Sequence, residues 1–294
     1  MELCPLPKSN FGCQLPQDSD DFDRVIEVAK HCERIGYDSV WVYDHLSPFW
    51  SRSGQAFECW TTLSAVAART NSVKVGSLVT NVGLRNPSLL AKMSSTIDNI
   101  SNGRLILGLG TGDKMSREEL HSYGYRFPDL NERVERLRES IQILKAMWTN
   151  DEVTFHGKHY EISRAVNLPK PKQRPHPPIW IGGRHLRILD VVAEFADGWN
   201  YWGLSKDGLE RRKDYLAKKC AEHGRKPSSI LKAWSGTFQQ LSDGARSHSE
   251  LSRNIAGKLR NQADAETRYF IASFDSRADP ESYQAFADAV KNLA

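Results

Sequence analysis

Apolar and polar positions along the 294-residue chain alternate between two periods. Short runs rich in β-branched and aromatic residues predict strands, and the segments after most of them repeat apolar residues every three to four positions, as amphipathic helices do. The expected strands lie at residues 11–15, 39–43, 73–79, 104–110, 179–183, 197–201, 231–239 and 269–274. The pattern therefore indicates eight strand–helix units.

Helix boundaries carry sequence signals of their own. Asp21 can cap a helix that continues to about residue 35, and Pro87 suits the first turn of a helix that ends near residue 100. The last helix has the strongest start signal, because Asp279 can act as its cap and Pro280 can occupy its first position.

The alternation breaks between residues 113 and 177, where we expect a polar loop, a helix over about 131–148, a hairpin around Gly157 and a proline-rich connector. Eight strand–helix units of ordinary size match a (β/α)8 barrel of about 250 residues. A doubly wound sheet would normally use fewer strands. We therefore predict an α/β fold: one domain over residues 1–294, a (β/α)8 TIM barrel with an insertion at about 113–177 between strands 4 and 5.

Composition narrows the possible functions. The net charge of +4 comes with no concentrated basic stripe, which argues against a nucleic-acid partner. No window approaches the ~20 apolar residues that span a bilayer, and the first residues lack the pattern of a signal peptide. The five widely spaced cysteines include no C-x-x-C pair and are typical of reduced thiols. We expect a cytoplasmic protein without membrane or nucleic-acid partners.

Candidate chemistry lies where the barrel strands end, because (β/α)8 enzymes carry their active sites at that face. His45 follows the second strand and titrates near neutral pH, although a histidine there can also be purely structural. Gly182 and Gly183 precede Arg184 at the start of a helix, a combination that favours a phosphate; the alternative is a tight turn with surface arginines.

Two other motifs say little about function. The run Gly108–Gly112 is not a dinucleotide fingerprint, because position 113 is Asp113 where that motif needs glycine. His156 and His159 flank Gly157 without the accompanying carboxylates of a metal site. We expect no metal.

Several motifs in order resemble the luciferase-like monooxygenase superfamily, and the resemblance covers essentially the whole chain. They are Asp44-His45, the run Phe57–Thr70, the run Asn102–Gly112, the run Pro178–Gly183 and Ala196–Asn200. The resemblance implies a (β/α)8 barrel with an insertion and a cofactor that is FMN or the deazaflavin coenzyme F-420. Gly110-Thr111-Gly112-Asp113 is similar to the coenzyme F-420 branch.

The resemblance also implies roles for single residues. His45 would lie near the hydride-accepting carbon, with Asp113 beside the substrate. Trp50 is similar to a tryptophan of sugar-phosphate dehydrogenases in that branch, but it stands one residue further from His45, so the sugar-phosphate substrate is not carried over. The residues expected to hold the cofactor are Asp44, Ser77, Leu78, Thr80, Asn81, Thr111, Gly112, Gly182, Gly183, Arg184, Tyr201, Trp202 and Gly203.

The expected function is a coenzyme F-420-dependent oxidoreductase, a homodimer that moves a hydride between the deazaflavin and a small organic substrate. The alternatives are an FMN-dependent monooxygenase and a non-catalytic flavin-binding protein. Resemblance to the coenzyme F-420 enzymes also predicts a cis peptide bond between Ser77 and Leu78, with Gly76 before it.

Overall fold

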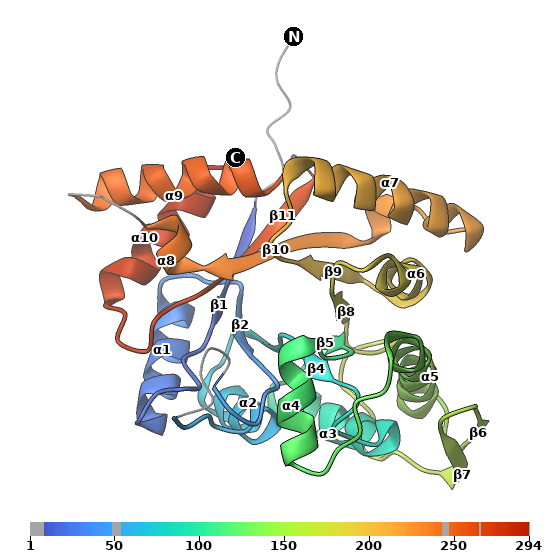
Figure 1. The fold of residues 1–294 in the computed structure, drawn as a ribbon. Helices are drawn as coiled ribbons and strands as arrows, with labels where there is room; N and C mark the ends of the chain where they lie inside the picture. Colours follow the sequence, from blue (N-terminus) through green and yellow to red (C-terminus); the bar gives the residue numbers. More distant parts are fainter. Residues whose placement is uncertain (1–8, 49–53, 243–246, 265, 294) are drawn as a thin grey trace.

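Parallel strands follow one another around a closed barrel, and helices surround it (Figure 1). The computed structural model describes residues 9–48, 54–242, 247–264 and 266–293. The sheet runs in the order β3-β2-β1-β11-β10-β9-β8-β5, and a pairing of β3 with β5 closes it. The predicted (β/α)8 barrel is confirmed.

The strands and helices agree closely with the sequence pattern. The barrel strands are β1 (Asn10–Gln14), β2 (Ser39–Val42), β3 (Lys74–Ser77), β5 (Leu105–Gly110), β8 (Ile179–Gly182), β9 (Gly198–Tyr201), β10 (Leu231–Thr237) and β11 (Thr267–Ser273). The surrounding helices are α1 (Phe22–Arg34), α2 (Cys59–Arg69), α3 (Pro87–Ile100), α5 (Leu130–Thr149), α6 (Leu186–Phe195), α7 (Lys206–Glu222), α9 (His248–Gln262) and α10 (Pro280–Lys291). The smaller elements are β4 (Thr80–Asn81), which pairs with β5, α8 (Phe238–Leu241) and a short 3-10 turn at Pro227–Ser229.

The stretch between β5 and β8 contains a helix that the sequence pattern missed. Residues 113–130, expected to be a loop, include α4 (Lys114–Ser122), while α5 and the hairpin of β6 (Val153–His156) and β7 (Glu161–Ala165) lie where they were predicted. Helix α5 packs between α3 and α6 in the ring of helices. It therefore occupies the helix position of the fourth strand–helix unit, and α4 and the hairpin are the additional elements.

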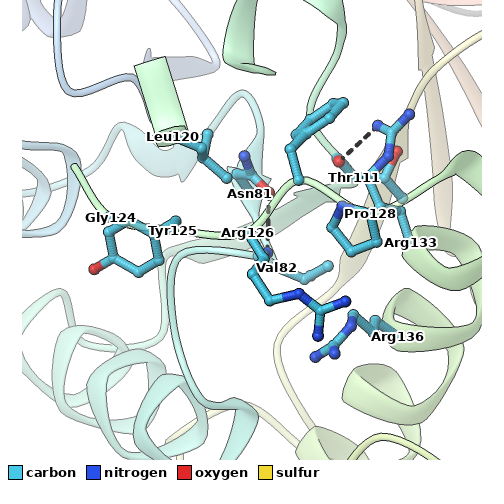
Figure 2. Close-up of a pocket in the computed structure, with 12 residues that line it drawn as sticks. Asn81, Val82, Thr111, Leu120, Gly124, Tyr125, Arg126, Pro128, Arg133 and Arg136 are labelled. Carbon is cyan, nitrogen blue, oxygen red and sulfur yellow. Dashed lines mark hydrogen bonds between the residues drawn. The ribbon is translucent and has the colours of Figure 1, made fainter. Parts of the chain in front are cut away.

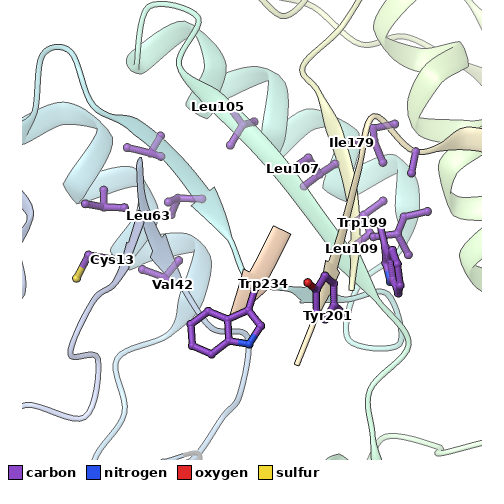
Figure 3. Packing of buried hydrophobic residues seen from close by; sticks show 14 of the residues in the cluster. Cys13, Val42, Leu63, Leu105, Leu107, Leu109, Ile179, Trp199, Tyr201 and Trp234 are labelled. Carbon is purple, nitrogen blue, oxygen red and sulfur yellow. The ribbon is translucent and has the colours of Figure 1, made fainter. Parts of the chain in front are cut away.

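Alternating side chains of β5 enter two different apolar clusters. Leu105, Leu107 and Leu109 belong to the large cluster between the strands and the helices (Figure 3). Ile106 instead belongs to a smaller cluster with Trp41 and Trp180. This period of two is that of a strand whose two faces are both buried.

Aromatic rings fill the smaller cluster. The ring centres of Trp41 and Trp180 lie 5.0 Å apart, and the ring of Tyr269 meets Trp180 edge-on at 5.0 Å. Gly76 of β3 makes room for the indole: a Cβ atom there would lie 2.5 Å from Trp41 Cζ3 and 2.9 Å from the backbone oxygen of Ile106. The packing inside the barrel therefore depends on Gly76, which faces Trp41.

Replacing Gly76 by alanine should destabilise the protein by about 1–3 kcal/mol, the usual cost of overpacking a closed core. Gly257→Ala is the matched control, because its added Cβ meets nothing within 4 Å and alanine favours the surrounding helix α9. Denaturant unfolding of both variants measures the difference. Equal stability of the Gly76 variant and the wild type would show that the barrel interior adapts to the extra methyl group.

Within the described residues, no helix is long and apolar enough to cross a membrane. The same residues include no group of three His, Cys, Asp or Glu side chains that could hold a metal ion.

Candidate functional site

His45 lies three residues after the end of β2 and is paired with a carboxylate from α4. Its Nδ1 lies 3.0 Å from Oε2 of Glu119, and both side chains are largely shielded, with exposed fractions of 16% and 7%. A histidine–carboxylate pair of this kind fixes the ring orientation and the tautomer. His45 is therefore held in one orientation at the end of the barrel where the strands terminate.

Glu119 binds more than the histidine. Its Oε1 accepts hydrogen bonds from the backbone amides of Leu46 (2.6 Å) and Ser47 (2.8 Å) and from Ser47 Oγ (3.0 Å). Burial raises the pKa of Glu119, but the hydrogen bonds from His45 and Ser47 lower it by a larger amount. The net pKa is therefore below the ordinary value. The carboxylate fixes both the imidazole and the loop that follows it.

Sequence reasoning missed Glu119 because it missed α4. The start of that helix was visible: Asp113 accepts from the backbone amide of Ser116 at 3.0 Å, and Ser116 Oγ lies 3.2 Å from the Asp113 amide, which makes a reciprocal capping box. Asp113, expected beside the substrate, thus caps α4. Its contact with substrate stays a prediction.

Asp44 is buried in an ionic network rather than aimed into open space. Arg85 donates to both of its oxygens (2.6 and 2.9 Å), and the backbone amide of Asn81 donates to Oδ2 at 2.9 Å. Arg85 also reaches Glu58, the cap of α2, at 2.6 Å. Burial raises the pKa of Asp44 more than Arg85 lowers it. The network links Asp44 to the residues that precede helices α2 and α3.

The predicted cis bond was wrong by one residue, because the cis peptide joins Leu78 and Val79. Ser77 and the amide of Leu78 still take part in the barrel: Ser77 Oγ donates to the Gly108 oxygen at 2.9 Å, and the Leu78 amide donates to the Val42 oxygen at 2.7 Å. Strand β3 ends at Ser77, and the Leu78 amide still bonds β2 before the cis peptide.

Four of the expected cofactor residues lie at or after the ends of β3 and β5: Ser77, Thr80, Thr111 and Gly112. Thr80 is fully buried and donates to Ser77 Oγ at 2.8 Å, so neither hydroxyl is exposed. The oxygens of Thr111 and Gly112 accept from Nη1 of Arg133, at 3.0 and 2.5 Å. Arg133, absent from the sequence-based set, thereby fixes the glycine turn after β5.

A cluster of arginines follows β8 and β9. Arg184 donates to the Gly203 oxygen at 3.0 Å and lies over the ring of Trp202, and Arg212 Nε donates to the Arg184 oxygen at 2.6 Å. Burial lowers the pKa of Arg212, and the charges of Arg184 and Arg211 lower it further. Among the described ion pairs, none joins these three guanidinium groups to a carboxylate. The cluster therefore carries uncompensated positive charge.

Beside the cluster, Gly182 and Gly183 form the predicted turn. Gly183 has φ = +141°, and its amide donates to the Asn200 oxygen at 3.1 Å. The side chain of Tyr201 lies in the buried layer beneath the helices, where its hydroxyl bonds Thr267 at 2.8 Å. Trp50 lies outside the described residues.

Comparison with known proteins identifies relatives along nearly the whole chain. The family model described as luciferase-like monooxygenase matches residues 5–293. A coenzyme F-420-dependent glucose-6-phosphate dehydrogenase of Amycolatopsis mediterranei is 31% identical over 85% of this chain and 73% of that protein. An FMNH2-dependent dimethylsulfone monooxygenase of Pseudomonas putida is 27% identical over 92% of this chain and 68% of that protein. Alignments with four further glucose-6-phosphate dehydrogenases of the first kind span only 51–56% of those proteins.

Among solved structures, a coenzyme F-420-dependent secondary alcohol dehydrogenase in complex with an F-420–acetone adduct has a TM-score of 0.84. It shares 18% sequence identity, with 98% of this chain and 99% of that chain covered. This likeness shows the fold.

Proposed function

Because the chain belongs to the luciferase-like monooxygenase family, we propose that it is a coenzyme F-420-dependent oxidoreductase that transfers a hydride between the deazaflavin and a small organic substrate. Relatives described as coenzyme F-420-dependent dehydrogenases support this choice of cofactor. One structural observation carries the proposal: the His45–Glu119 pair and the arginine cluster with its glycine turn lie at the same end of the barrel.

The residues present fit such a cofactor. Gly183 adopts a positive φ that few side chains tolerate, and Arg184 and Arg212 supply positive charge beside it. An anionic tail would be held at this turn, where glycine backbone, a helix start and guanidinium groups come together. When bound, the deazaflavin supplies two-electron hydride transfer.

The chain itself supplies the proton chemistry. Glu119 accepts at Nδ1 of His45 and keeps a proton on that nitrogen. This makes Nε2 the nitrogen that exchanges a proton with the substrate, as charge changes at the substrate oxygen or nitrogen during hydride transfer. Buried Asp44, fixed by Arg85, holds the chain segment between β2 and His45 in place.

Titration of the cofactor-free protein with coenzyme F-420 and with FMN tests the assignment. We expect clearly tighter binding of coenzyme F-420, followed by its reduction or oxidation by some member of a panel of alcohols, sugar phosphates, enones and imines. Tighter binding of FMN would favour the monooxygenase alternative, which the similarity to the dimethylsulfone monooxygenase supports. Cofactor binding without turnover on any donor or acceptor would favour a flavin-binding protein.

A further inference from the structure

A cavity of about 260 Å³ opens beside the ends of β4 and β5, under the loop that joins α4 to α5 (Figure 2). It is smaller than the roughly 300–1,000 Å³ of a pocket for a whole drug-sized ligand. Its lining residues are Asn81, Val82, Gly83, Thr111, Leu120, residues 124–128, Arg133 and Arg136. Of these, Asn81 donates its backbone amide to Asp44, and Leu120 follows Glu119, the partner of His45, so the cavity adjoins the end of the barrel where His45 lies.

Three arginines and no carboxylate line this cavity. Figure 2 shows the side chains of Arg126 and Arg136 extending toward one another. The nearest paired acid, Glu132, contacts Arg136 at 2.8 Å and Arg126 only at 3.9 Å. The single carboxylate of Glu132 is thus shared by the guanidinium groups of Arg126 and Arg136.

Arg133 adds a third positive charge in the wall. It lies 4.2 Å from the centre of the Phe127 ring, and its Nε is buried with no hydrogen-bond partner. The described ion pairs include none for Arg133, and the charges of Asp113 and Asp129 act on it from their positions as helix caps. The charge of Arg117 also acts on Arg133, so four cationic groups face the three acids Glu132, Asp113 and Asp129.

We propose that this cavity binds an oxyanion group, a phosphate or a carboxylate, of a small molecule that works at the adjoining end of the barrel. Guanidinium groups match the planar, multidentate geometry of such anions, and the cavity holds a group of that size rather than a whole cofactor. The inference deepens the proposed function, on which it rests: the oxyanion belongs either to the substrate or to a further anionic group of the cofactor tail, separate from the one held at Gly183.

Calorimetric titration with inorganic phosphate at low ionic strength tests the site in the full chain, both free and loaded with coenzyme F-420. Arg126→Met and Arg136→Met should each weaken one class of phosphate binding about tenfold, the usual effect of losing a charge-assisted hydrogen bond. Arg126 is 80% exposed, so its variant should fold even if the Arg136 variant does not. Arg253→Met on the distant helix α9 is the matched control and should change affinity less than twofold.

The two arms identify the source of the anion. Arginine-dependent phosphate binding that persists in the loaded protein assigns the cavity to the substrate. Phosphate binding that disappears when the cofactor is loaded points to the cofactor. The cavity is then assigned to the cofactor if both variants also bind the intact cofactor more weakly, but bind a deazaflavin without the tail as the wild type does. Phosphate binding that both variants leave unchanged in the free and the loaded protein would overturn the proposal. A wild type that binds no cofactor would instead contradict the proposed function, and the free-protein titration would still decide the cavity.

Discussion

Replacing Glu119 by glutamine should lower kcat about 100-fold, within the usual contribution of a positioned acid–base group. The amide oxygen of glutamine can still accept from the amides of Leu46 and Ser47, so the loop should keep its shape. The amide nitrogen, however, would face Nδ1 of His45 as a donor. The imidazole would then carry its proton on Nε2, the wrong nitrogen for the proposed exchange.

Steady-state kinetics and cofactor titration separate this effect from general damage. The cofactor affinity of the Glu119→Gln variant should stay within about twofold of the wild type, while kcat falls. Glu27→Gln on α1, where the side chain is 71% exposed, is the control and should leave both quantities unchanged. An equal loss of kcat in the two variants, or a normal kcat in the Glu119 variant, would remove Glu119 from the mechanism.

Gly183→Asp should weaken binding of the cofactor more than 100-fold without unfolding the protein. The new carboxylate would lie where an anionic tail is expected, and like charges placed together cost about 3 kcal/mol. The added Cβ would also lie 3.2 Å from Ile188 and require a φ of +141°. Gly183→Asn has nearly the same shape and strain without the charge, and we expect it to weaken binding only about tenfold.

Cofactor titration together with thermal unfolding of both variants checks this prediction. The difference between Asp and Asn reports the charge, since the backbone strain is common to the two. If the folded Asp variant keeps wild-type affinity, the anionic tail is held elsewhere, and the uncompensated charge around Arg184 needs another explanation.

The fold could be predicted from the sequence because its signals are local. Strand periodicity, the cap at Asp279 and the proline at the start of α3 each act within a few residues, and all of them were found where expected. The same reading missed α4, because its polar residues show no apolar stripe. The capping pair Asp113 and Ser116 was the available signal.

The site was only partly predictable, because its network joins residues far apart in the chain. His45 and Asp44 were found from their position after a strand, but Glu119 and Arg85 lie 74 and 41 residues away from the groups they bind. No spacing rule connects such partners. The cis bond was misplaced by one residue because only the resemblance to the coenzyme F-420 enzymes, and no spacing within this chain, assigned it to Ser77 and Leu78.

The tightly packed rings of Trp41, Trp180 and Tyr269 have a kinetic consequence. They fill the interior of the barrel, so substrate and cofactor reach and leave His45 through the end at which the strands terminate. A molecule that lies deeper must then arrive before, and leave after, one that lies above it. If the flat cofactor is the deeper of the two, the order of addition is compulsory, and the departure of the outer product limits how soon the next turnover begins.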